Sequence, residues 1–144
     1  MIATRERTVP AAPEAVWALV GDPRSLPRWW PRTERVENVR EDAWTTVMRS
    51  DRGRVVRADW RLEETEPPRR RAWSQALAGT PFEKVISERR VEVRVEPAEA
   101  GSTVTLELRQ RSRKLGRFGD LVLRGPAARE LDAALAQLAE ALAA

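Results

Sequence analysis

The 144-residue chain has no histidine, no cysteine and no tyrosine, and only two phenylalanines and two lysines. Without cysteine it cannot form a disulfide framework or a thiolate metal site. Without histidine it lacks the side chain that most often ligates metals and carries protons near neutral pH. These absences argue against most nucleophilic, metal-dependent and redox chemistry, so we expect neither a metal nor a cofactor.

Long hydrophobic runs are also missing. Nowhere do eighteen apolar residues follow one another, and the first seven residues do not contain the apolar stretch that is typical of a signal peptide. The sequence therefore predicts a cytoplasmic protein that does not span a membrane. Its length suits a single domain over residues 1–144, which we expect to be a monomer or a weak homodimer.

The charge pattern does not favour nucleic acid. The chain carries 26 basic and 22 acidic residues, and because only two of the basic residues are lysines, 24 are arginines. The sequence pI of about 10.8 reflects the high pKa of arginine rather than a large positive field, since the net charge is only +4. No basic stripe with interleaved aromatics is visible, so we expect no nucleic-acid partner.

In contrast to these absences, the chain contains six tryptophans. Each indole buries a large apolar surface, and its N–H needs a hydrogen-bond partner when it is buried. Any one of them can be explained as core packing. Together, with so few other aromatics, they are an unusual way to fill a core and indicate a protein that binds an apolar molecule.

The order of elements is readable from periodicity and turn residues. A strand is predicted over 2–9, a short helix over 13–20, and a second short helix through Leu26, Trp29 and Trp30. From about residue 33 the pattern has a period of two, interrupted by turn-forming residues, which predicts an antiparallel meander. Its strands are expected at 43–49, 55–64, 71–77, 85–96 and 103–112.

One face of this sheet is predicted to be covered. Val104, Leu106 and Leu108 alternate with polar residues, and the other strands show the same pattern. The covering element is a C-terminal helix, which we expect to begin at Pro126 and to run for 18 residues with Leu131 and Leu135 on its apolar stripe.

Three short stretches, and the order of elements over essentially the whole chain, resemble a known superfamily. The resemblance rests on the stretch PAAPEAVWALVGDP at 10–23, followed by LPRWWP at 26–31, and on GSTVTL at 101–106. These stretches and the element order are similar to the START/Bet v 1-like (SRPBCC) superfamily, in its bacterial polyketide cyclase/dehydrase and lipid-transport-like branch. The resemblance implies an α+β helix-grip fold, in which a curved antiparallel sheet of six to seven strands wraps a long C-terminal helix, with two short helices after the first strand.

The resemblance also implies a cavity between sheet and helix that binds lipids, polyketides or aromatic compounds. Our leading hypothesis is a carrier or sensor of an apolar small molecule. The alternative is a cyclase, aromatase or dehydratase, which requires a charged side chain that faces the cavity. A second alternative is a protein-interaction module, which requires an exposed apolar patch such as one around Trp29 and Trp30. The enzyme question stays open, because the tyrosine and histidine that such cyclases commonly use are absent.

The candidate ligand-binding residues come from the predicted inner faces and from two loops. We expect one of Trp29 and Trp30 to pack inward and the other to sit at the cavity rim, and Phe118, between two glycines, to act as a movable plug. The complete set is Trp29, Trp30, Met48, Trp60, Leu62, Trp73, Gln75, Phe118, Leu131 and Leu135.

The charged residues of the strands are expected on the solvent face. This holds for the ion ladder of Arg57 with its neighbours and for the ladder of Arg89, Glu92 and Arg94. If a β-bulge shifts the strand parity by one residue, Arg57 becomes the polar anchor of the pocket.

Overall fold

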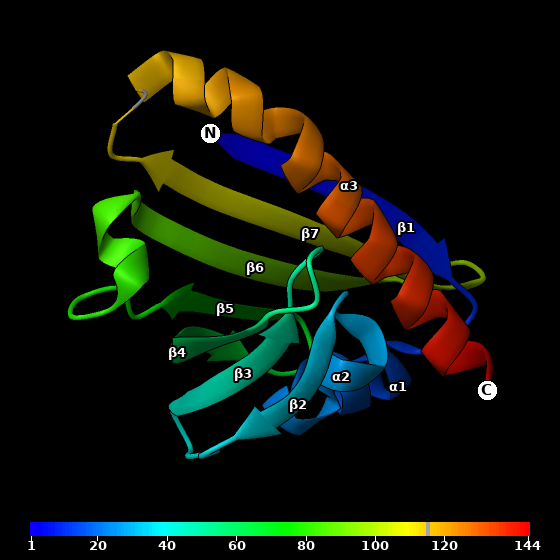
Figure 1. The fold of residues 1–144 in the computed structure, drawn as a ribbon. Coiled ribbons are helices and arrows are strands. Elements are labelled where there is room, and N and C mark those ends of the chain that lie inside the picture. Colours follow the sequence, from blue (N-terminus) through cyan, green and yellow to red (C-terminus); the bar gives the residue numbers. More distant parts are fainter. Residues whose placement is uncertain (115) are drawn as a thin grey trace.

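The computed structural model describes residues 1–114 and 116–144. The chain forms one antiparallel sheet, three α-helices and two short 3₁₀ helices (Figure 1). In chain order these are β1 (Ile2–Val9), α1 (Pro13–Val20), η1 (Pro23–Ser25), α2 (Leu26–Trp29), β2 (Thr33–Glu37), β3 (Ala43–Arg49), β4 (Val55–Glu66), β5 (Arg70–Gln75), η2 (Pro81–Lys84), β6 (Ile86–Ala98), β7 (Gly101–Ser112) and α3 (Gly116–Ala143).

The sheet has the strand order β1-β7-β6-β5-β4-β3-β2, and every neighbouring pair is antiparallel. Strands β2 to β7 form a meander, and β1 returns to pair with β7 along its whole length. The sheet curves, and α3 packs on β1 and β7 and against α2 (Figure 1). This is the predicted α+β helix-grip fold with seven strands and two short helices after the first strand.

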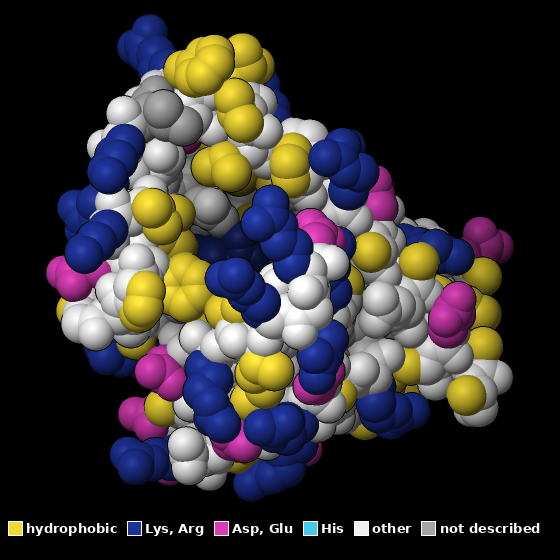
Figure 2. Space-filling model, viewed as in Figure 1, with side chains coloured by type: hydrophobic (Ala, Val, Ile, Leu, Met, Phe, Trp, Pro, Cys, Tyr) yellow, Lys and Arg dark blue, Asp and Glu magenta, His cyan; other side chains and the backbone are white. Residues whose placement is uncertain are grey.

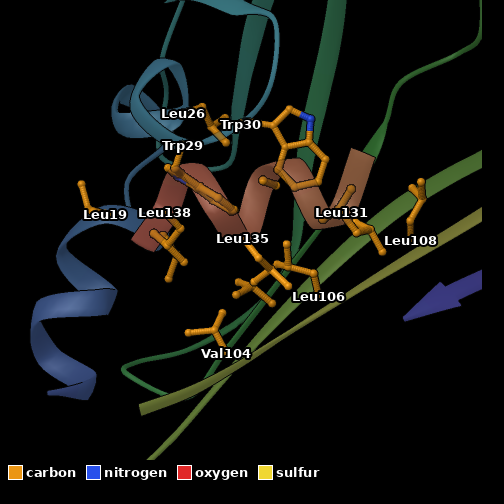
Figure 3. Close-up of a cluster of buried hydrophobic side chains, with 14 of the residues drawn as sticks. Leu19, Leu26, Trp29, Trp30, Val104, Leu106, Leu108, Leu131, Leu135 and Leu138 are labelled. Carbon is orange, nitrogen blue, oxygen red and sulfur yellow. The ribbon is translucent and has the colours of Figure 1, made fainter. Parts of the chain in front are cut away.

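The core lies between the sheet and α3. Leu106 and Leu108 of β7 are almost completely buried, as are Leu131 and Leu138 of α3. Each such side chain contributes about 2 kcal/mol from burial, and the spacing in α3 repeats every three or four residues, which keeps one helix face on the sheet. Figure 3 shows these side chains gathered between the helix and the strands. The predicted alternation of β7 is confirmed.

The two adjacent tryptophans of α2 are both buried, with Trp29 at 0% and Trp30 at 8% exposure. The expectation that one would pack inward and the other would sit at the cavity rim assumed that both belong to one helix. Instead α2 ends at Trp29, and Trp30 adopts an extended backbone with φ −92° and ψ 128°. The rings meet edge to face at 5.5 Å, and the indole nitrogen of Trp30 points away from the leucine cluster (Figure 3).

The C-terminal helix differs from its prediction. It begins at Gly116, ten residues before Pro126, and contains this proline inside it. Pro126 is exposed, so its ring and its missing N–H are accommodated on the solvent side of the helix. Phe118, which we expected to act as a movable plug between two glycines, therefore lies in the first turn of α3. Leu115, just before this turn, lies outside the described residues. The predicted strand ranges did not include β2.

Candidate functional site

A cavity of about 350 Å³ opens on the inner face of the sheet. Because α3 packs on β1 and β7, part of the inner face of β3 to β6 is left to form the cavity floor. The end of α2, η2 and one position of α3 complete the wall. Figure 2 shows a hollow in this part of the molecule, with hydrophobic side chains on its wall and Lys or Arg side chains within it and at its rim. Its apolar lining consists of Leu26, Trp30, Pro31, Met48, Val56, Trp60, Trp73, Phe82, Val85, Ile86 and Val91.

Three indoles dominate this lining, and two of them are fixed by hydrogen bonds. The Nε1–H of Trp60 on β4 donates to Oγ1 of Thr46 on β3 at 2.9 Å, a diagonal contact, because Trp60 itself pairs with Trp44. The Nε1–H of Trp30 donates to a carboxylate oxygen of Glu130 at 3.1 Å. Trp73 meets the ring of Trp44 at 6.2 Å behind the cavity wall. The aromatic walls are therefore held rigidly in place.

A charged network lies against the cavity. Arg89 of β6 donates from Nη2 to both carboxylate oxygens of Glu130 of α3, at 2.9 Å each. Its Nη1 donates to Oε1 of Gln110 of β7 at 2.5 Å. The side chains of Arg89 and Glu130 are only 19% and 28% exposed. Together with Trp30, this network joins the end of α2, α3 and two central strands across the cavity.

Two further arginines reach the cavity lining from the rim. Arg32 pairs with Asp51, and Arg49 pairs with Glu34 and also donates to the carbonyl of Gly53 at 2.8 Å. The hydrogen bond from Arg49 lowers the pKa of Glu34 from its ordinary value. Each of the three arginines that line the cavity thus has a carboxylate partner, and the positive charges are balanced locally.

Two uncharged polar side chains of the cavity lining are nearly buried. Thr33 and Gln75 are 8% and 9% exposed. Within the described part of the chain, the Oγ1 atom of Thr33 and the Nε2 atom of Gln75 have no hydrogen-bond partner. A buried polar group without a partner costs about 1–3 kcal/mol, so both are positioned to gain from a group that a ligand supplies.

The outer face of the sheet carries a separate ion cluster. Glu92 is 3% exposed and is surrounded by Arg70, Arg90 and Arg94, with N···O distances of 2.9, 3.4 and 2.5 Å. Burial raises the pKa of Glu92, but the hydrogen bond from Arg70 and the charges of Arg94 and Arg70 outweigh burial, so the pKa lies below its ordinary value. On the inner face, burial lowers the pKa of Arg71.

Neither a metal centre nor a membrane-spanning helix is found where the structure describes the chain. The described residues contain no group of three metal-ligating side chains. No helix among residues 1–114 and 116–144 is both long and apolar enough to cross a bilayer. The polar groups in the cavity lining are indole, amide and hydroxyl groups, three guanidinium groups and the carboxylate of Glu130.

Comparison with known proteins agrees with this geometry. The family model described as polyketide cyclase / dehydrase and lipid transport matches residues 2–143, nearly the whole chain. The chain belongs to this family. No curated protein matches its sequence.

Solved structures share the fold of this family member. A protein from Thermus thermophilus has a TM-score of 0.77 at 20% identity, covering 99% of this chain and 97% of that one. A protein from Nitrosomonas europaea has a TM-score of 0.76 at 17% identity, with 99% and 94% covered. The di-domain ARO/CYC BexL from the BE-7585A biosynthetic pathway has a TM-score of 0.80 at 14% identity, with 100% of this chain and 50% of that chain covered. At these identities the likeness shows the fold alone.

In this polyketide cyclase/dehydrase family member, five of the predicted ligand-binding residues lie together in the cavity lining. They are Trp30, Met48, Trp60, Trp73 and Gln75. Met48, Trp60, Trp73 and Gln75 come from the neighbouring strands β3, β4 and β5, and Trp30 directly follows α2.

The other predicted residues lie elsewhere. Trp29, Leu131 and Leu135 are buried in the core, and Leu62 packs against it half-buried. Phe118 is 66% exposed on α3 and does not line the cavity. Arg57 is exposed on the outer face, where it pairs with Glu37. The register shifts that the structure contains lie in β2, β4 after Leu62, and β6 before Glu88, so none turns Arg57 inward.

Sequence reasoning missed the polar network. Arg89 was expected on the solvent face with Glu92 and Arg94, and this expectation is wrong. Arg89 precedes Val91 by two residues and therefore shares its inward face, whereas Glu92 and Arg94 point outward. The same parity places Gln110 on the inner face, two residues after Leu108. Glu130 carried no comparable signal, because its partners lie 41 and 100 residues away.

Proposed function

We propose that this protein binds a largely apolar, flat small molecule in the cavity and carries or senses it in the cytoplasm. The observation that supports the proposal most directly is the cavity of about 350 Å³ with three indoles in its lining. Ligand pockets in proteins span roughly 300–1,000 Å³ and combine apolar walls with a few polar groups. Thr33 and Gln75 provide such groups here, because each holds an unpartnered buried atom within the described part of the chain.

The family supports the same reading at a coarser level. Its description names polyketide cyclases, dehydrases and lipid transport, and all of these handle hydrophobic molecules. The protein-interaction alternative required an exposed apolar patch around Trp29 and Trp30, and both side chains are buried. We therefore place ligand binding ahead of it.

A second candidate function is supported by a specific observation. A cyclase, aromatase or dehydratase needs a charged side chain facing the cavity, and Arg89 with Glu130 meets this requirement. Under this alternative Arg89 orients a carbonyl oxygen and Glu130 exchanges a proton with the substrate. Turnover of a polyketide-like substrate that is lost in Glu130→Gln, while binding of that substrate is retained, would favour the enzyme.

The test of binding is intrinsic tryptophan fluorescence during titration with fatty acids, sterols, flavonoids and aromatic polyketides. Saturable quenching is expected for at least one class. It should be reduced in Trp60→Phe and Trp73→Phe, which keep an aromatic ring and avoid the roughly 3–5 kcal/mol cost of truncating a buried tryptophan to alanine.

Trp17→Phe is the matched control, because Trp17 is half-buried on α1 and does not line the cavity. The quenching amplitude assigned to the cavity should persist in this variant. Absence of a response to every compound class, confirmed by calorimetry, would refute the proposed function.

A further inference from the structure

We propose that the cavity selects uncharged ligands, and that Glu130 enforces this selection by occupying Arg89, the guanidinium that β6 presents to the cavity. The inference rests on the proposed binding function and adds the class of ligand to it. Its basis is the arrangement of Arg89, whose Nη2 contacts both oxygens of Glu130 at 2.9 Å and whose Nη1 contacts Gln110 at 2.5 Å.

The hydrogen bonds of Arg89 make it a poor receptor for an acidic ligand. A carboxylate or sulfonate that approaches Nη2 of Arg89 competes with Glu130, which is held in place by a second hydrogen bond from Trp30 at 3.1 Å. The displaced carboxylate stays in the same partly buried wall, because Glu130 is fixed to α3. Two anions close together in a partly buried site repel each other more strongly than in bulk solvent.

The rim does not offer an alternative anchor for an anion. Arg32 and Arg49 also line the cavity, but each already pairs with a carboxylate, Asp51 and Glu34 respectively. These pairs are largely exposed, so they are also screened by solvent and salt. The charges that line the cavity therefore cancel in pairs.

The groups that remain for recognition are uncharged. Thr33 offers a hydroxyl and Gln75 an amide, each with a buried atom that has no partner in the described part of the chain. These groups suit a carbonyl or hydroxyl oxygen on an otherwise apolar molecule. A neutral aromatic ketone or phenol fits this description, whereas a fatty acid in its ionised form does not.

The experiment compares two fluorescent probes that share one ring system. N-phenyl-1-naphthylamine is neutral, and 8-anilino-1-naphthalenesulfonate carries a sulfonate on the same skeleton. The wild-type protein is expected to bind the neutral probe at least about tenfold more tightly, the factor that a single unfavourable charge interaction of ordinary size produces. Displacement of one probe by the other, followed by energy transfer from tryptophan, establishes that both occupy the same site.

The decisive variant is Glu130→Gln, which keeps the shape and an acceptor for Trp30 but leaves the charge of Arg89 without a counter-ion. Affinity for the sulfonate probe is expected to rise about tenfold, with the neutral probe changed less than about threefold. Glu140→Gln is the matched control, because Glu140 is exposed on the same helix and its loss changes the net charge equally. The double variant Arg89→Gln/Glu130→Gln should return to the wild-type preference.

Equal affinity of the wild-type protein for the two probes would overturn the inference, and this comparison does not depend on any variant folding. An unchanged sulfonate affinity in Glu130→Gln would overturn it as well, provided that circular dichroism shows a folded variant. If the neutral probe and all the compound classes above fail to bind, the proposed function fails first. If the neutral probe binds without charge selection, only the present inference fails.

Discussion

Substituting Glu92 by glutamine tests the electrostatic account of the outer sheet face. Glu92 is 3% exposed and has three arginines within 3.4 Å of its carboxylate oxygens. Removing one partner of a fully buried ion pair costs about 3–5 kcal/mol. Here the arginines keep partial access to solvent, with side-chain exposures of 14–49%, and two of them keep other carboxylate partners. We therefore expect a loss of about 2 kcal/mol, which lowers Tm by about 4–8 °C for a chain of this size.

The loss should depend on pH in a defined direction. The folded-state pKa of Glu92 is lowered, so its stabilising contribution is fully present above the ordinary carboxyl value of 4.5 and disappears as the pH falls through the lower folded-state pKa. The stability difference between wild type and Glu92→Gln should be constant from neutral pH down to about pH 5 and should shrink below it.

Urea unfolding followed by tryptophan fluorescence measures this difference at each pH. Glu96→Gln is the control, because Glu96 is exposed on the same strand and the same face and should change stability by less than about 0.5 kcal/mol. Equal stability of Glu92→Gln and wild type at pH 7, or a difference that grows in acid, would refute the reasoning.

Four further substitutions test local features by urea unfolding. Trp60→Phe loses the indole hydrogen bond and should cost about 1–2 kcal/mol, with a cost near zero contradicting the assigned bond. Gly101→Ala should cost about 2–4 kcal/mol, because φ is +147° and a Cβ atom would meet the backbone of residues 9–11. Gly53→Ala, with φ +75° and open space around it, should cost only about 1 kcal/mol, so equal costs would count against the steric argument. Pro126→Ala should stabilise α3 by about 1–2 kcal/mol, and hydrogen exchange in this helix should slow rather than accelerate.

The fold was predictable because its strands show clear alternation. Val104, Leu106 and Leu108 establish the inward face of β7 from sequence alone, and turn residues delimit the meander. The start of α3 was not predictable in the same way. Gly125 and Pro126 read as the beginning of a helix, but an exposed proline is tolerated within one when packing on either side holds it.

The residues of the site could be predicted where their direction follows from alternation along one strand. They could not be predicted where the site depends on contacts between residues far apart in the sequence. Trp60, Trp73 and Gln75 follow from alternation along β4 and β5. The inward position of Arg89 also follows from alternation, because Val91 lies two residues further along β6 and points inward. Grouping Arg89 with the charged residues Glu92 and Arg94 predicted the wrong face. The choice of Glu130 as its partner depends on how α3 lies across the sheet, and no local pattern encodes that placement.

The pairing of β1 with β7 has a consequence for folding kinetics. Each pair in the meander joins neighbours in sequence, whereas β1 and β7 pair residues as far as 107 positions apart, such as Ile2 and Arg109. By the logarithmic scaling of loop closure, joining ends about 100 residues apart costs roughly 2.7 kcal/mol more than closing a five-residue hairpin. We therefore expect the meander to form early as a local unit and β1 to dock late. Packing of α3 is expected to follow this step, because the helix packs on both β1 and β7.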